Sequence, residues 1–131
     1  MAIDIGYATI DIRTADYNSK IGSFPQGTSL IIRLTVLNDA SPLTLTDSTI
    51  NGYVISYSKL DGKSIKYDLG ELNLDSNGKV IVTGNYITKD ANKCAIVLKI
   101  TNGTDILFTT PLYYYVNYNP AYELEDNTTT E

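Results

Sequence analysis

The chain has 131 residues, a formal net charge of −5, one cysteine and no histidine. A hydrophobic fraction of 43% beside 19% charged residues indicates one folded globular domain, and the acidic balance argues against the clustered Lys and Arg that nucleic acid or an anionic membrane would need. One cysteine excludes an internal disulfide, and the lack of histidine removes the commonest general base and metal ligand, so we expect no enzyme, no cofactor and no metal site.

The N-terminal segment, MAIDIGYATIDIR, has neither the basic region nor the continuous apolar stretch of a signal peptide. We therefore expect a protein that is made in the cytoplasm and is not exported by the usual route. Residues 3–13 alternate weakly, which predicts a half-buried strand. Its apolar side carries Ala8, Ile10 and Ile12, and its polar side carries Thr9, Asp11 and Arg13.

Residues 14–27 contain two glycines, a proline and several polar turn formers, and are predicted to be a long connection fastened by Ile21 and Phe24. Residues 28–38 then form the clearest strand. Its alternation places Leu30, Ile32, Leu34 and Val36 in the core, while Ile31 and Leu37 on the other side indicate a strand covered on both faces.

One hairpin and a further turn are predicted in the middle of the chain. Residues 39–48 form a turn with Pro42, and a strand over 49–58 places Tyr53, Ile55 and Tyr57 on one face. Asp61-Gly62 returns the chain into residues 63–69, since glycine tolerates positive φ at little cost. Asn77-Gly78 is the next turn, leading into residues 79–83, and residues 84–92 are irregular with a helical turn near Ile87.

The last two strands are joined by the polar turn NGTD at residues 102–105. The first of them directs Cys94, Ile96, Leu98 and Ile100 inward, and the second has its larger apolar residues at even positions from Ile106 to Tyr118. Pro111 interrupts the second strand and indicates an edge strand or a bulge. Cys94 is expected to be a small buried hydrophobe and not a nucleophile, because no histidine can activate it.

About seven strands, with turns roughly every ten residues, predict an all-β fold: an antiparallel two-sheet sandwich of immunoglobulin-like type. The Cys…Trp…Cys hallmark of antibody domains is absent, since the chain has no Trp. We expect one domain over residues 1–120. Residues 121–131 have no apolar pattern and are expected to be a disordered tail or the start of a linker.

The chain has eleven tyrosines beside two phenylalanines. Tyrosine offers a large contact area at low entropic cost and keeps a hydroxyl for hydrogen bonding, although it is also a favoured strand residue. Tyr114 and Tyr118 are predicted to be in the core. Tyr113 and Tyr115, on the opposite face, are either an interface or simply exposed. The candidate interface residues are Arg33, Tyr113, Tyr115 and Tyr122.

The order and spacing of several segments resemble the N-terminal immunoglobulin-like domain of phage upper baseplate proteins. The resemblance covers Leu30 to Tyr118. It rests on five segments in order. These are the strand LIIRLTV, the segment LTLTDSTI, a strand that ends in KLDGK, the turn NGKV, and the final pair of strands CAIVLKITNGTDILFTTPLYYYV. No single one of these segments is diagnostic by itself.

This resemblance implies a structural protein of the tail baseplate of phages of Gram-positive bacteria, located in the virion. In that family the domain docks on the central tail hub, and a following stalk, often trimeric, carries the receptor-binding proteins. It implies no catalytic residue, and the partners it implies are the hub, the receptor-binding protein and further copies of the chain. This chain departs from the family by stopping soon after the domain, so it is either a piece of a longer stalked protein or a stand-alone variant.

A carbohydrate-binding module is the alternative function. Surface tyrosines would then stack on sugar rings of the host cell wall, and Asp and Asn would bind their hydroxyl groups. The absence of Trp, which such sites commonly use, counts against this alternative.

Overall fold

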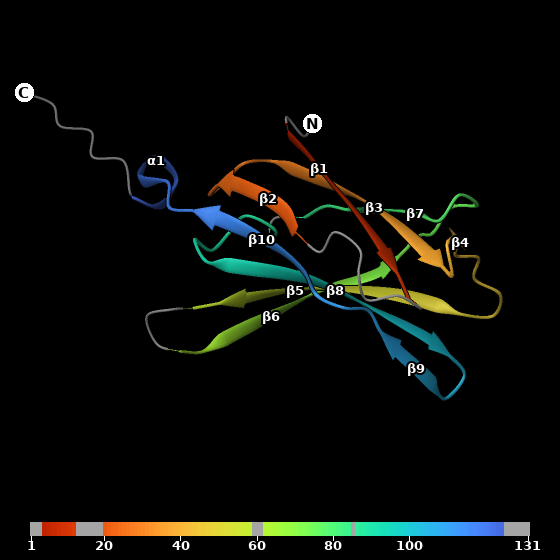
Figure 1. The fold of residues 1–131 in the computed structure, drawn as a ribbon. Coiled ribbons are helices and arrows are strands. Elements are labelled where there is room, and N and C mark those ends of the chain that lie inside the picture. Colours follow the sequence, from red (N-terminus) through yellow and green to blue (C-terminus); the bar gives the residue numbers. More distant parts are fainter. Residues whose placement is uncertain (1–3, 13–19, 59–61, 85, 125–131) are drawn as a thin grey trace, which may run out of the picture.

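The computed structural model describes residues 4–12, 20–58, 62–84 and 86–124. They form two β-sheets packed face to face, with a short helix at the C-terminal end (Figure 1). The all-β sandwich predicted from the sequence is confirmed. The described residues contain ten strands and one helix, namely β1 Asp4–Asp11, β2 Lys20–Pro25, β3 Leu30–Asn38, β4 Ser41–Pro42, β5 Thr49–Tyr57, β6 Ser64–Leu72, β7 Lys79–Val82, β8 Lys93–Asn102, β9 Asp105–Phe108, β10 Leu112–Asn117 and α1 Pro120–Glu123.

The smaller sheet is built around β3, which pairs with β1 along one edge and with β4 and β7 along the other. The larger sheet has the order β2-β10-β8-β5-β6, and β9 lies beside β8. Two of the pairings, β1 with β3 and β2 with β10, are parallel, so both sheets are mixed and not purely antiparallel as expected.

The core lies between the two sheets and contains the side chains that the alternation in β3 and β8 predicted. Ile32, Leu34 and Val36 are fully buried from the smaller sheet, and Ile96 and Leu98 are fully buried from the larger one. Burying apolar surface of this extent is the main driving force for the two-layer arrangement.

A β-bulge separates β9 from β10, where Pro111 indicated an edge strand or a bulge. Phe108 pairs with Lys99 and Leu112 pairs with Ile96, so three residues on this side face two on β8. Thr109 bridges the irregularity: its N–H donates to the Leu98 carbonyl at 2.9 Å, and its hydroxyl accepts from the Leu98 N–H at 3.0 Å. The extra residue reverses the alternation, so even-numbered Phe108 points outward whereas Leu112 points inward.

Three expectations need correction. The structure has more strands than the seven expected. Strands β4 and β9 are too short to show a sequence pattern of their own, and Lys20–Pro25, which was predicted to belong to the connection 14–27, forms β2. Tyr118 is 58% exposed and lies beyond the end of β10, so it is not a core residue. Asp11, expected on a polar side, is only 3% exposed, because its carboxylate binds backbone N–H groups of the turn after β3.

Some expectations fall wholly or partly outside the described residues. Of the connection 14–27, residues 14–19 lie there, as does Asp61 of the predicted Asp61-Gly62 turn. Gly62 has φ +68° and Gly78 has φ +75°, as the two predicted turns require. Of residues 121–131, residues 121–123 belong to α1, and residues 125–131 lie outside.

Candidate functional site

The candidate interface residues lie in three separate places. Tyr113 and Tyr115 point outward from the larger sheet, since they alternate on β10 with buried Tyr114. Arg33 points outward from the smaller sheet, on the opposite side of the sandwich, since it alternates on β3 with Ile32 and Leu34. Tyr122 belongs to α1. One protein surface therefore cannot cover all of them at once.

The outward side of the larger sheet carries a continuous group of aromatic and aliphatic side chains. The registers place Tyr53 beside Val97, Ile55 beside Ala95, and Ala95 beside Tyr113. The bulge adds Phe108, which lies opposite Lys99 and is 59% exposed. We call this surface the tyrosine face; it comprises Tyr53, Ile55, Tyr57, Val97, Ile106, Phe108, Tyr113 and Tyr115.

Three lysines lie over rings of the tyrosine face. The ammonium group of Lys93 is 4.2 Å from the ring centroid of Tyr113, that of Lys66 is 5.1 Å from Tyr53, and that of Lys99 is 6.0 Å from Phe108. These distances permit cation–π attraction. The alkyl stems cover apolar surface while the charged ends remain accessible, so the face combines apolar contact area with positive charge.

The tyrosine face is not flat. A depression of about 370 Å³ is lined by Tyr57, Ser58, Lys93 and Tyr113. A second, of about 180 Å³, lies among Tyr53, Ile55, Lys66, Val97, Lys99 and Phe108. Desolvation raises the pKa of Tyr57, and Tyr113 contributes to the shift. A tyrosine hydroxyl is protonated at neutral pH even without this shift, so the Tyr57 hydroxyl can act as a hydrogen-bond donor.

A second candidate region is the junction between the sandwich and α1. The side-chain amide of Gln26, which is 3% exposed, donates to the Lys89 carbonyl at 2.8 Å and accepts from the Asn119 N–H at 3.3 Å. Asn119 donates in turn from its Nδ2 to the Gln26 carbonyl at 3.0 Å and caps α1 through Ala121. We call this set of hydrogen bonds the exit latch.

Tyr122 completes the contact between α1 and the sandwich. Its ring lies directly against Gly27, so closely that a Cβ atom at that position would collide with it. Gly27 also has φ +85°, a conformation that disfavours other residues. Tyr122 is 50% exposed, so one side of its ring holds α1 and the rest remains accessible.

Cys94 is buried, and desolvation raises the pKa of its thiol to about 11, so it is neither accessible nor ionised at neutral pH. Within residues 4–12, 20–58, 62–84 and 86–124, no group of three or more His, Cys, Asp or Glu side chains could hold a metal ion. No helix in the same ranges is long and apolar enough to cross a membrane.

Tyr113 and Tyr115 were interface candidates from the sequence, whereas Tyr53, Tyr57 and the lysines on the same side of the sheet were not. The signal for Tyr53 and Tyr57 was present, because both alternate with buried Val54 on β5. What the sequence does not give is the order of strands, which places β5 and β10 on either side of β8.

Comparisons with known proteins found similarity among solved structures. No family model matches the chain, and no curated protein matches it in sequence. Among solved structures, the N-terminal domain of phage TP901-1 ORF48 is similar, with a TM-score of 0.57 and 10% identity over 88% of this chain and 99% of that one. The resemblance to a phage N-terminal domain that the sequence suggested is thus confirmed at the level of the fold.

Proposed function

We propose that the chain is a structural adaptor domain of a phage tail baseplate, which docks on the central tail hub and positions a stalk that carries receptor-binding proteins. The sequence resemblance suggests this role, and the fold shared with a phage N-terminal domain supports it. The observation that carries the proposal is the tyrosine face, since it provides a contact surface of the kind that a rigid adaptor needs. The role involves no catalytic step.

The composition of the tyrosine face suits a protein partner. Tyrosine and phenylalanine are enriched at protein interfaces because they supply large, rigid contact areas. Ile106 is 55% exposed and Phe108 is 59% exposed, so apolar surface that folding leaves in water becomes buried when a partner docks. Lys66, Lys93 and Lys99 border these rings, and the complementary hub surface is therefore acidic.

The exit latch suits the second half of the role. An adaptor transmits orientation only if the segment that leaves it is held firmly. Here α1 and its cap Asn119 are held against one loop, at the adjacent residues Gln26 and Gly27, and the Gln26 amide connects that loop to the Lys89 carbonyl. In Figure 1 the β8–β9 hairpin lies at the opposite end of the sandwich from α1. Ile106 and Phe108 of the tyrosine face belong to β9, so docking centred on that end of the face would leave the exit accessible to a stalk.

In this role the chain resides in the virion after synthesis in the host cytoplasm, with the hub, the receptor-binding protein and further copies of itself as partners. Repetition around a tail would make a modest interface sufficient. Simultaneous binding of several linked copies raises the overall avidity by about 10²–10⁴ without any new contact, provided that the geometry allows it.

Removal of two outward tyrosines tests the docking. We expect the combined Tyr113→Ala and Tyr115→Ala variant to bind the tail-hub protein encoded beside this chain at least about tenfold more weakly, since truncated aromatic anchors commonly cost more than 1 kcal/mol each. The measurement is biolayer interferometry with the purified hub. Tyr7→Ala is the matched control, because Tyr7 is 63% exposed on the opposite sheet and should leave the affinity unchanged. Unchanged hub binding by a folded double variant would exclude the tyrosine face as the dock.

The exit latch gives a second test. Gln26→Ala removes the bonds of the amide to Lys89 and Asn119, so we expect amide hydrogen exchange of Asn119 and Tyr122 to accelerate by about tenfold or more. Exchange in β3 and β8 should stay unchanged, because those strands do not depend on the latch. Equal acceleration throughout the sandwich would instead make Gln26 a general stability residue.

A further inference from the structure

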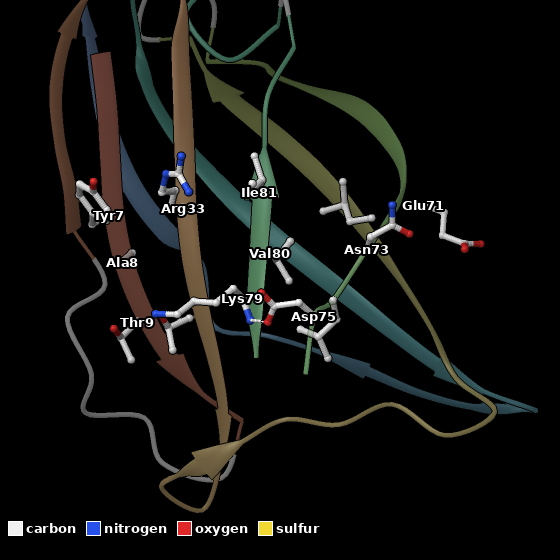
Figure 2. Close-up of a pocket in the computed structure, with 13 residues that line it drawn as sticks. Tyr7, Ala8, Thr9, Arg33, Glu71, Asn73, Asp75, Lys79, Val80 and Ile81 are labelled. Atoms are coloured by element: carbon white, nitrogen blue, oxygen red, sulfur yellow. Dashed lines mark hydrogen bonds between the residues drawn. The ribbon is translucent and has the colours of Figure 1, made fainter. Parts of the chain in front are cut away.

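The outward side of the smaller sheet contains a groove of about 980 Å³, far from the tyrosine face. Figure 2 shows its floor formed by β1, β3 and β7, with the segment from Glu71 to Asp75 rising beside β7. Ala8 and Val80 contribute to its base. This volume is at the upper end of the range typical of small-molecule sites, about 300–1,000 Å³.

The strand registers place the polar and aromatic groups of the floor in two rows. Tyr7 pairs with Arg33, and Arg33 pairs with Ile81, so these three side chains cross the sheet at one level. The next row consists of Thr9, Thr35 and Lys79. Strands lie about 4.8 Å apart, so the first row extends roughly 10 Å, enough for an aromatic platform at one end and hydrogen-bonding groups beside it.

Several polar side chains of the groove have no side-chain partner among the described residues. Arg33, Glu71 and Asn73 make no side-chain hydrogen bond or ion pair with any residue that the structure describes. Lys79 donates to the Thr35 hydroxyl at 3.0 Å, and Asp75 accepts the N–H groups of Asn77 and Lys79 within its own turn. Within the described part of the chain, the groove therefore carries an unpartnered guanidinium on its floor, and an unpartnered amide and carboxylate along its wall.

We propose that this groove binds a neutral saccharide. A sugar hydroxyl is both a donor and an acceptor, so the same ligand can pair with the Arg33 guanidinium, the Glu71 carboxylate and the Asn73 amide. Tyr7, which is 63% exposed at the end of the row, provides an accessible ring face for the apolar side of a sugar.

The mixed charge of the groove argues against other ligands. A phosphate or carboxylate would pair with Arg33 but would be repelled by Glu71 and Asp75. A cation would be attracted by the two carboxylates but repelled by Arg33. A protein covering the groove would remove Arg33, Glu71 and Lys79 from water and would need a partner for each of them. The hydroxyl groups of a sugar can supply these partners for both signs of charge, because each hydroxyl is a donor and an acceptor.

The test is titration of the isotopically labelled chain, followed by two-dimensional NMR, with short oligosaccharides of N-acetylglucosamine, glucose, galactose or rhamnose at millimolar concentration. We expect at least one of them to shift the backbone amides of residues 7–9, 33–35, 73–75 and 79–81. Tyr7→Ala should weaken that binding by about three- to tenfold, because the sugar would lose its contact with the exposed ring. Arg33→Ala should weaken it as well.

Tyr115→Ala is the matched control, since it removes an exposed tyrosine from the larger sheet and should leave saccharide binding unchanged. Tyr7→Phe keeps the ring and should retain most of the affinity. The proposal is overturned if no oligosaccharide of the panel binds, if the shifted amides lie on the larger sheet, or if Tyr7→Ala binds as tightly as the unmodified chain. Hub docking is measured separately and on the other sheet, so either proposal can fail alone.

Discussion

Tyr114→Ala is expected to lower the free energy of unfolding by about 3–5 kcal/mol, the range for truncating a large aromatic side chain in a core. Tyr114 is fully buried on β10, with its ring centroid 6.5 Å from that of Phe24. Its hydroxyl donates to the Ile87 carbonyl at 2.6 Å. The substitution therefore leaves both a cavity and an unpaired buried carbonyl, which urea denaturation would measure.

Tyr114→Phe separates these two effects, because it keeps the ring and removes only the hydroxyl. We expect a cost of about 1–3 kcal/mol, since the Ile87 carbonyl would lose its buried donor. Tyr115→Ala, at the neighbouring and 37% exposed position, should change stability by only about 0.5 kcal/mol. If Tyr114→Phe were neutral, the hydroxyl bond would not be what holds Ile87 in place.

Tyr114 also connects the two regions that the proposed adaptor role uses. Its neighbours Tyr113 and Tyr115 belong to the tyrosine face, whereas its hydroxyl holds the loop that contains Ile87. Two residues further, the Lys89 carbonyl accepts from Gln26 of the exit latch. A single buried side chain therefore links the strand of the docking surface to the loop that fixes the exit.

The strands that could be predicted are those whose own residues alternate clearly between apolar and polar. Alternation in β3 and β8 identifies Leu34 and Leu98 as core residues, because a strand with one face buried must repeat every second residue. The turns at Gly62 and Gly78 were predictable for a similar local reason, since both have positive φ.

The parts that were not predictable depend on contacts between distant segments. Strand β2 contains Gly22 and Pro25 and has no clear alternation, and it is a strand because it pairs in parallel with β10. Tyr118 continued the even-numbered pattern of β10, but β10 ends at Asn117 and the pattern carries no information about that end. The separation of Arg33 from Tyr113 likewise follows from which sheet each strand joins.

The burial of Asp11 could not be predicted either, because it depends on contacts with a distant segment. In the sequence it belongs to the polar side of an alternating strand, yet it is buried at the end of β1. Its Oδ1 accepts from the Asp39 N–H at 3.0 Å, and its Oδ2 accepts from the Ala40 N–H at 2.8 Å. Asp39 and Ala40 have φ values of 53° and 68°, which cost non-glycine residues about 1–2 kcal/mol each. The carboxylate therefore stabilises a strained turn that the sequence did not connect with it.

Asp11→Asn is expected to lower the free energy of unfolding by about 2–3 kcal/mol, because hydrogen bonds to charged groups contribute more than neutral ones and the new amide would direct an N–H at a backbone donor. Asp75→Asn is the matched control. Asp75 also accepts two backbone N–H groups, at 2.8 and 2.9 Å, but it is exposed, so water can replace the lost bonds and we expect a cost of about 1 kcal/mol or less. Urea denaturation of both variants measures the difference. If both variants lost the same unfolding free energy, the number of hydrogen bonds alone would decide the contribution of each carboxylate. A larger loss in Asp11→Asn would show that burial strengthens its contribution.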